Sequence, residues 1–169
     1  MMELVEALKK DGVDKGLCRL WRGKLKPGMS VEEMISLYIK GIDFCIQEDF
    51  PTLNFIRENF KGKCEQHGVF IDDNITDCRN VQDIVLNGDC KAMLEYDGYS
   101  VSRLFTRHST RAAINVSDHA ILTIDAFNNS NLTIATSGSP VVYVNLYGNS
   151  TAECIGTGFK VKQINKNTY

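Results

Sequence analysis

Residues 119–134 read HAILTIDAFNNSNLTI, and residues 141–154 read VVYVNLYGNSTAEC. In both stretches apolar residues recur at every second position until a cluster of Asn, Ser or Gly interrupts the pattern. A period of two is typical of a strand with one buried face, and Asn, Ser and Gly are typical of turns. Each stretch therefore predicts a strand, a turn and a second strand.

The same pattern repeats every ten residues through the C-terminal part of the chain. One apolar position of the repeat is occupied by Leu94, Leu104, Ile114, Ile124, Ile134, Val144, Cys154 and Ile164, with Ile84 one step earlier. Alternate turns differ, because Phe127 matches Tyr147 and Asn129 matches Asn149 at a spacing of twenty residues. The full unit therefore has about twenty residues and two strands.

Two folds provide such a unit. In a short β-solenoid each twenty-residue coil stacks on the one before, so that like residues form ladders about 4.8 Å apart. In an antiparallel β-meander, like residues lie two strands apart and scarcely touch. The turns are long for hairpins, and stacked Asn, Ser and aromatic residues fit a ladder. The pattern favours the solenoid, with about four coils, over the meander.

The N-terminal part has helical periodicity instead. Ser30 followed by Glu33 is a capping box, and it predicts a helix from there to about Glu48. Thr52 predicts the start of a shorter helix that ends near Gly62. We expect about four helices, and an α+β chain with a helical cap or bundle over residues 1–66 and a β-solenoid over residues 67–169.

The two quoted stretches resemble the short-repeat β-solenoid proteins of Bacteroides-type gut bacteria and their phages, which are built from units such as A-T-V-x-A-Y-G-N-S. The resemblance covers about residues 85–160. It implies a structural or binding role in a phage-encoded context, as a virion component or as a binder of a host factor, and it supplies no catalytic residue.

Charge and hydropathy restrict the partners. The net charge is −2, so no global basic field favours nucleic acid or an anionic membrane. No apolar run approaches the roughly 18 residues of a membrane span, and residues 1–10 lack the order of a secretion signal. We expect a cytoplasmic or virion-associated protein whose six cysteines stay reduced.

Two groups of residues are candidates for a metal site and for a catalytic site, and each also has a simpler interpretation. Cys64 and His67, with the later Cys78 and Cys90, contain ligand types of a zinc site, but only one pair has close spacing, which favours ordinary thiols. His108 and His119, with Ser109 and Asp118 near them in sequence, suggest a Ser/His/Asp set. Successive turns of a flat coil lie at opposite edges, which favours solvated turn residues instead.

Further residues suggest binding surfaces. Arg103, Arg107 and Arg111 suggest a small basic patch, although a solvated face explains them better. Aromatic residues along a solenoid wall suit sugar rings or a partner protein, and here Phe127, Tyr143 and Tyr147 are the candidate ligand-binding residues.

The motifs of common enzymes, such as a Walker loop or His-Glu-x-x-His, do not occur in the sequence. We therefore predict a non-enzymatic structural or interaction protein without a cofactor, in which the helical part serves assembly or docking and the solenoid is a rigid surface. A protein partner or self-association is expected. The alternative is a carbohydrate-binding solenoid with an aromatic ladder.

Overall fold

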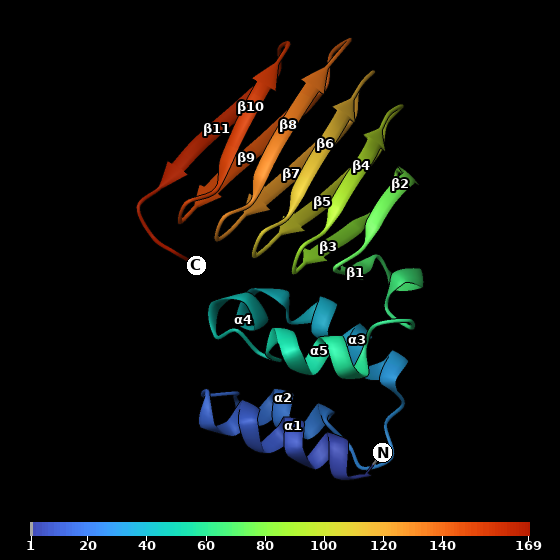
Figure 1. Cartoon of the computed structure of the whole chain (residues 1–169), viewed down its shortest axis with the longest axis vertical. Helices are drawn as coiled ribbons and strands as arrows, with labels where there is room; N and C mark the ends of the chain where they lie inside the picture. The colour runs from blue at the N-terminus through green and yellow to red at the C-terminus, as the bar shows by residue number, and fades with distance from the viewer. Residues whose placement is uncertain (1) are drawn as a thin grey trace. The chain divides into compact units, whose positions relative to one another are not determined.

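The structure, a computed structural model, describes residues 2–169 (Figure 1). The chain divides into two compact units, and the division falls between His67 and Gly68. The first unit is helical and the second, Gly68–Thr168, is built of strands.

Over its described residues the first unit forms five short α-helices and one 3-10 helix, one more α-helix than the sequence predicted. They are α1 (Met2–Asp14), α2 (Arg19–Lys24), α3 (Val31–Lys40), α4 (Ile42–Gln47), α5 (Leu53–Asn59) and η1 (Glu65–His67). No helix in the described range is both long and apolar enough to cross a membrane.

Both predicted helix starts are confirmed. The Ser30 hydroxyl accepts a hydrogen bond from the Glu33 backbone N–H (3.1 Å), and the Glu33 carboxylate accepts one from the Ser30 N–H (2.8 Å). The Thr52 hydroxyl accepts one from the Phe55 N–H (3.3 Å) at the start of α5. These side chains satisfy N–H groups that have no partner within the helix.

The helix predicted to run to about Glu48 breaks at Gly41. The backbone of this residue (φ −107°, ψ 26°) leaves helical geometry between α3 and α4. Glycine is among the weakest helix formers, so the interruption costs little there. A Cβ at Gly41 would lie 3.4 Å from the Trp21 ring, so the break also brings α2 close to this turn.

The second unit is a β-solenoid of roughly five turns, one more than the sequence predicted. Its strands in the described range are β1 (Val69–Ile71), β2 (Asn74–Arg79), β3 (Asp83–Asn87), β4 (Lys91–Tyr96), β5 (Val101–Thr106), β6 (Arg111–Val116), β7 (Ile121–Ala126), β8 (Asn131–Thr136), β9 (Val141–Tyr147), β10 (Thr151–Ile155) and β11 (Phe159–Ile164).

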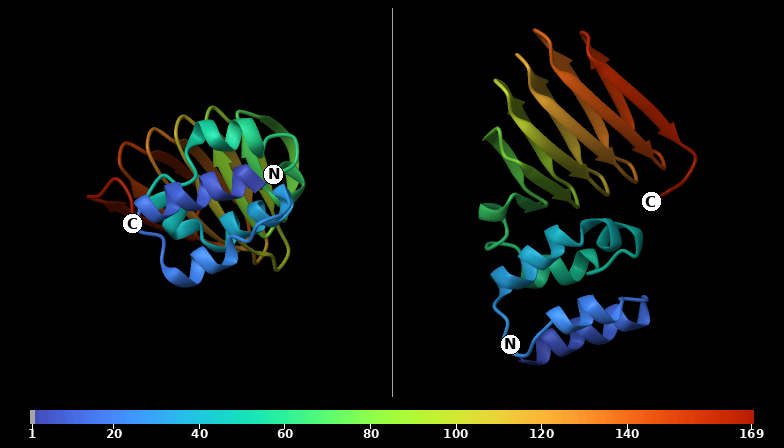
Figure 2. Two further views of the ribbon diagram at one scale, coloured as in Figure 1. Left: turned by 90° about the horizontal axis from the view of Figure 1, so that it is seen from below. Right: turned by 180° about the vertical axis from the view of Figure 1, so that it is seen from behind.

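Strand pairing decides between the two predicted folds. Odd-numbered strands form one sheet in the order β1-β3-β5-β7-β9-β11, and even-numbered strands form a second in the order β10-β8-β6-β4-β2. Every pair is parallel, which confirms the solenoid and excludes the meander. The views in Figures 1 and 2 show the successive strands stacked side by side.

The predicted twenty-residue coil is confirmed by the register. In the central coils Ile114 lies opposite Leu94 on one side and Ile134 on the other. These side chains are almost fully buried, and they belong to a single apolar core between the two sheets. The ladder is less regular at its N-terminal end, where Val69 lies opposite Val85 and β2 shifts register between Ile75 and Cys78.

The turns also repeat. Every tenth residue has a positive φ: Gly88, Gly98, His108, Asp118, Asn128, Gly138, Gly148 and Gly158. Glycine, Asn and Asp tolerate this left-handed conformation best, which explains the residue types at this position. At alternate turns a buried Thr or Ser closes the bend, as when the Ser130 hydroxyl donates to the Phe127 carbonyl (2.7 Å).

Candidate functional site

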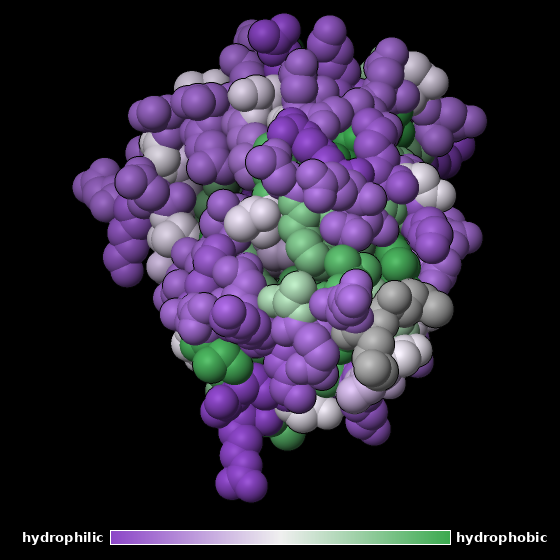
Figure 3. Space-filling view, turned by 60° about the horizontal axis from the view of Figure 1, so that its bottom comes forward, coloured by the Kyte–Doolittle hydropathy of each residue, from purple (hydrophilic) through white to green (hydrophobic). Residues whose placement is uncertain are grey.

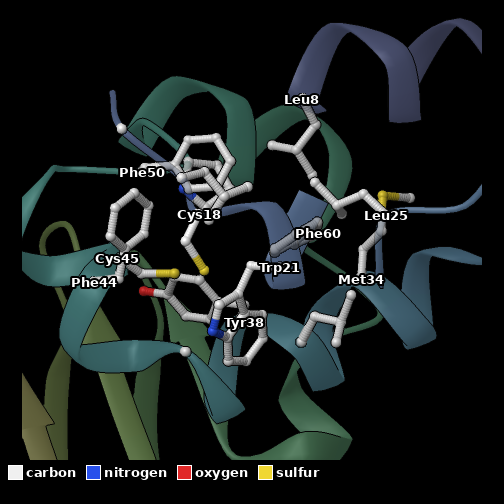
Figure 4. Close-up of a pocket in the computed structure, with 15 residues that line it drawn as sticks. Leu8, Cys18, Trp21, Leu25, Met34, Tyr38, Phe44, Cys45, Phe50 and Phe60 are labelled. Carbon is white, nitrogen blue, oxygen red and sulfur yellow. The ribbon is translucent and has the colours of Figure 1, made fainter. Parts of the chain in front are cut away.

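The helical unit contains an apolar pocket of about 290 Å³ (Figure 4). Its aromatic lining residues come from separate segments: Trp21 from α2, Tyr38 from α3, Phe44 from α4, Phe50 from the following turn and Phe60 from the end of α5. The pocket therefore exists only when the short helices are packed together.

The floor of the pocket is made of buried, closely packed side chains. Met34, Tyr38 and Phe60 are at most 3% exposed, and the rings of Tyr38 and Phe60 meet edge to face with their centroids 6.2 Å apart. Such pairs of rings add about 0.5–1.5 kcal/mol to the burial of their area. The floor is thus preformed by the same contacts that stabilise the unit.

The rim is more accessible than the floor. Trp21 and Phe44 are half-buried, and Cys18 is exposed. The Lys24 ammonium lies 4.1 Å from the centroid of the Trp21 ring, so a positive charge stands beside the opening. On the face of the molecule that Figure 3 draws, some hydrophobic surface is exposed among mainly hydrophilic residues.

The lining determines what the pocket can receive. The residues around it in the described chain are apolar or aromatic, apart from the thiols and the Tyr38 hydroxyl, and none carries a formal charge. Apolar surface transferred from water into such a site gains roughly 25 cal/mol per Å². The pocket is therefore suited to bind an apolar group.

The predicted aromatic ladder is present between Phe127 and Tyr147, whose rings stack with centroids 4.6 Å apart and planes inclined by 18°. Both side chains are buried, at 1% and 8% exposure, so their ring faces are largely covered. Tyr143 is 38% exposed, and the Lys160 ammonium lies 4.9 Å from its ring centroid. Of the three predicted residues, Tyr143 alone keeps an accessible ring.

The four residues that were considered as zinc ligands are divided between the two units. Cys64 and His67 belong to the helical unit, and Cys78 and Cys90 to the solenoid. The described residues contain no group of three or more His, Cys, Asp or Glu that could hold a metal ion. Burial raises the pKa of the Cys78 and Cys90 thiols, which disfavours the thiolate that a metal would bind.

The Ser/His/Asp set considered from the sequence does not form, because its residues make separate contacts in different turns. His108 Nδ1 accepts a hydrogen bond from the Gly88 N–H (3.0 Å), and Asp118 accepts one from the Gly98 N–H (2.9 Å) at the other edge. The His119 ring stacks on Tyr99, with centroids 5.0 Å apart. These side chains extend the ladder from coil to coil.

The three arginines do not form one patch either. Arg103 lies on β5 in one sheet and pairs with Asp83 (2.7 Å), whereas Arg111 lies on β6 in the other sheet. Arg107 is buried, with its guanidinium 3.4 Å from the Asn87 amide oxygen.

Among the buried polar groups of the solenoid, the Tyr96 hydroxyl is one that has no hydrogen-bonding partner in the described residues. The Tyr96 hydroxyl lies in the interior, and the side chain is 1% exposed. Burial raises the pKa of this phenol far above its ordinary value, so it stays protonated.

No protein-family model, curated protein or solved structure matches the chain. The candidate site therefore depends on geometry alone. Sequence reasoning missed the pocket, because its lining residues are spread over more than fifty positions and each of them has the pattern of an ordinary core residue. Trp21, the single tryptophan of the sequence, was the available signal.

Proposed function

We propose that this chain is a non-enzymatic interaction protein whose helical unit binds an apolar anchor of a protein partner in the aromatic pocket. The observation that carries the proposal is the pocket itself, with a preformed floor and an accessible rim. Pockets for small molecules usually span roughly 300–1,000 Å³. At about 290 Å³ this pocket suits one or two large side chains rather than an extended cofactor.

The chemistry of protein interfaces supports this choice of ligand. A few buried aromatic or aliphatic anchors supply most of the binding free energy, and they enter pockets from which water is excluded. An uncharged lining selects such an anchor over a polar one, because a buried polar group without a partner costs about 1–3 kcal/mol. Lys24 at the rim favours acidic residues beside the anchor.

The solenoid has a different role in this proposal. Its central coils keep one register from β4 to β8, and its outward side chains are not needed for the core. We assign it the role of a rigid surface or spacer. A virion or phage context for that role stays a prediction from the sequence.

A peptide selection tests the proposal. A library of random peptides is selected on the immobilised full-length chain, and the enriched peptides are titrated in solution against the emission of Trp21, the only tryptophan. We expect enriched peptides to carry at least one large apolar side chain, with acidic neighbours. Their binding should shift the Trp21 emission, since the ring lines the pocket.

A matched pair of substitutions locates the binding. Gly41→Leu extends a side chain from a position where a Cβ meets the Trp21 ring at 3.4 Å, and the φ of −107° accepts it. Filling the pocket in this way should weaken peptide binding about tenfold or more. Gly23→Leu lies on α2 with no atom near its Cβ, and it should leave binding unchanged. Equal binding to both variants would contradict the proposal.

A further inference from the structure

Within the described residues, no further strand pairs with the two strands of the C-terminal coil. β10 is the last strand of the five-stranded sheet and β11 is the last of the six-stranded sheet. Figure 1 draws these two strands as arrows of opposite direction at the end of the stack.

Both strands turn backbone groups to the open side. The Thr151 N–H donates to the Ser130 carbonyl (2.9 Å), so the alternation of the strand turns the groups of Ala152 and Cys154 away from β8. The Val142 N–H donates to the Gly158 carbonyl (2.9 Å), and the groups of Phe159 face the open side in the same way. Such edges are templates for a further strand.

The hydrophobic core is also open at this end. One coil earlier, Ile134 and Val144 are fully buried. Their register partners in the last coil are Cys154, which is only half-buried, and Val161, which is 49% exposed. An apolar cross-section of the solenoid interior therefore reaches the surface beside unpaired backbone.

The two edges carry opposite charges. The outward face of β10 has Glu153, which lies opposite Thr133 of the preceding coil. The outward face of β11 has Lys160 and Lys162, opposite Tyr143 and Asn145. All three charged side chains are exposed.

We propose that two copies of this chain associate end to end through the terminal coil, with β10 of each copy antiparallel to β11 of the other. A twofold axis along the strands gives this arrangement, and each five-stranded sheet then continues into the six-stranded sheet of the other copy. The exposed apolar ends become buried against one another.

Charge selects this arrangement over its alternative. A twofold axis perpendicular to the sheets would place β11 against a second β11, and Lys160 and Lys162 would face their own copies. Like charges opposite each other destabilise a pair of strands, and opposite charges stabilise it. When β10 of one copy pairs with β11 of the other, Glu153 of each copy lies on the same outward face as Lys160 and Lys162 of the other copy. Because both edges are used, association at this end stops at the dimer.

Sedimentation velocity of the full-length chain over a range of concentrations tests the proposal. We expect a dimer that dissociates on dilution. Glu153→Lys alone, or Lys160→Glu with Lys162→Glu, should weaken association about tenfold or more, because the twofold axis applies each change twice. All three substitutions together should restore the original dissociation constant.

Two controls complete the experiment. Ala113→Lys adds a lysine on the same exposed row two coils away from the edge, where it does not lie opposite Glu153, and it should leave the dimer unchanged. Gly41→Leu should also leave the dissociation constant of the dimer unchanged, so the dimer is tested independently of the pocket. A monomer at all concentrations would overturn the proposal. A charge-swapped triple variant that stays as weak as the single reversals would overturn it too.

Discussion

Ile114→Ala should lower the free energy of unfolding of the solenoid by about 2–5 kcal/mol, the usual cost of removing a large side chain from a core. Ile114 is 1% exposed and lies between Leu94 and Ile134 in the ladder. The substitution therefore removes contacts on two sides at once. The neighbouring coils share backbone hydrogen bonds with this strand and have little freedom to collapse into the cavity.

Urea denaturation followed by far-ultraviolet circular dichroism measures the change. Asn115→Ala is the matched control, because Asn115 is the next residue of the same strand and its side chain is exposed. We expect the control to change stability by no more than about 0.5 kcal/mol. A similar loss of unfolding free energy in both variants would mean that β6 does not have one buried and one exposed face, in conflict with the solenoid.

Gly158→Ala should destabilise the chain more than Gly98→Ala, although both glycines have a positive φ (87° and 60°). A Cβ at Gly98 would meet no atom within 4 Å, so its substitution adds only left-handed strain, roughly 1–2 kcal/mol. A Cβ at Gly158 would collide with the carbonyl oxygen of Pro140. This oxygen belongs to the backbone and cannot move freely.

For Gly158→Ala we expect a loss of about 3 kcal/mol or more, since the collision adds to the left-handed strain. Thermal unfolding of the two variants beside the original chain measures the difference. Equal melting temperatures for the two variants would contradict the close approach of coils at this turn.

The sequence predicted the solenoid because its constraints are local and repeated. A turn every ten residues needs a residue that accepts a positive φ, and Asp118, Asn128 and Gly138 satisfy this need in succession. The stack of Phe127 on Tyr147 followed from the twenty-residue spacing alone. In a solenoid the residues that lie opposite one another on neighbouring strands are one repeat apart in the sequence, so the period of the sequence predicts the register.

The irregular parts lack such a period. The pairing of Val69 with Val85 and the bulge in β2 depend on contacts that have no repeat in the sequence. The break at Gly41 was missed because the apolar stripe continues across it into α4. The pocket could not be predicted either, since its shape depends on how five short helices of the described chain pack.

A direct measurement tests whether the helical unit presents a binding pocket. The dye 1-anilinonaphthalene-8-sulfonate is titrated into the folded full-length chain while energy transfer from Trp21, the only tryptophan, is recorded. The account predicts saturable binding at one site with strong transfer, because Trp21 lines the pocket. Transfer should be lost in Gly41→Leu and kept in Gly23→Leu. A signal that never saturates, or that is equal in the two variants, would contradict the pocket as a binding site.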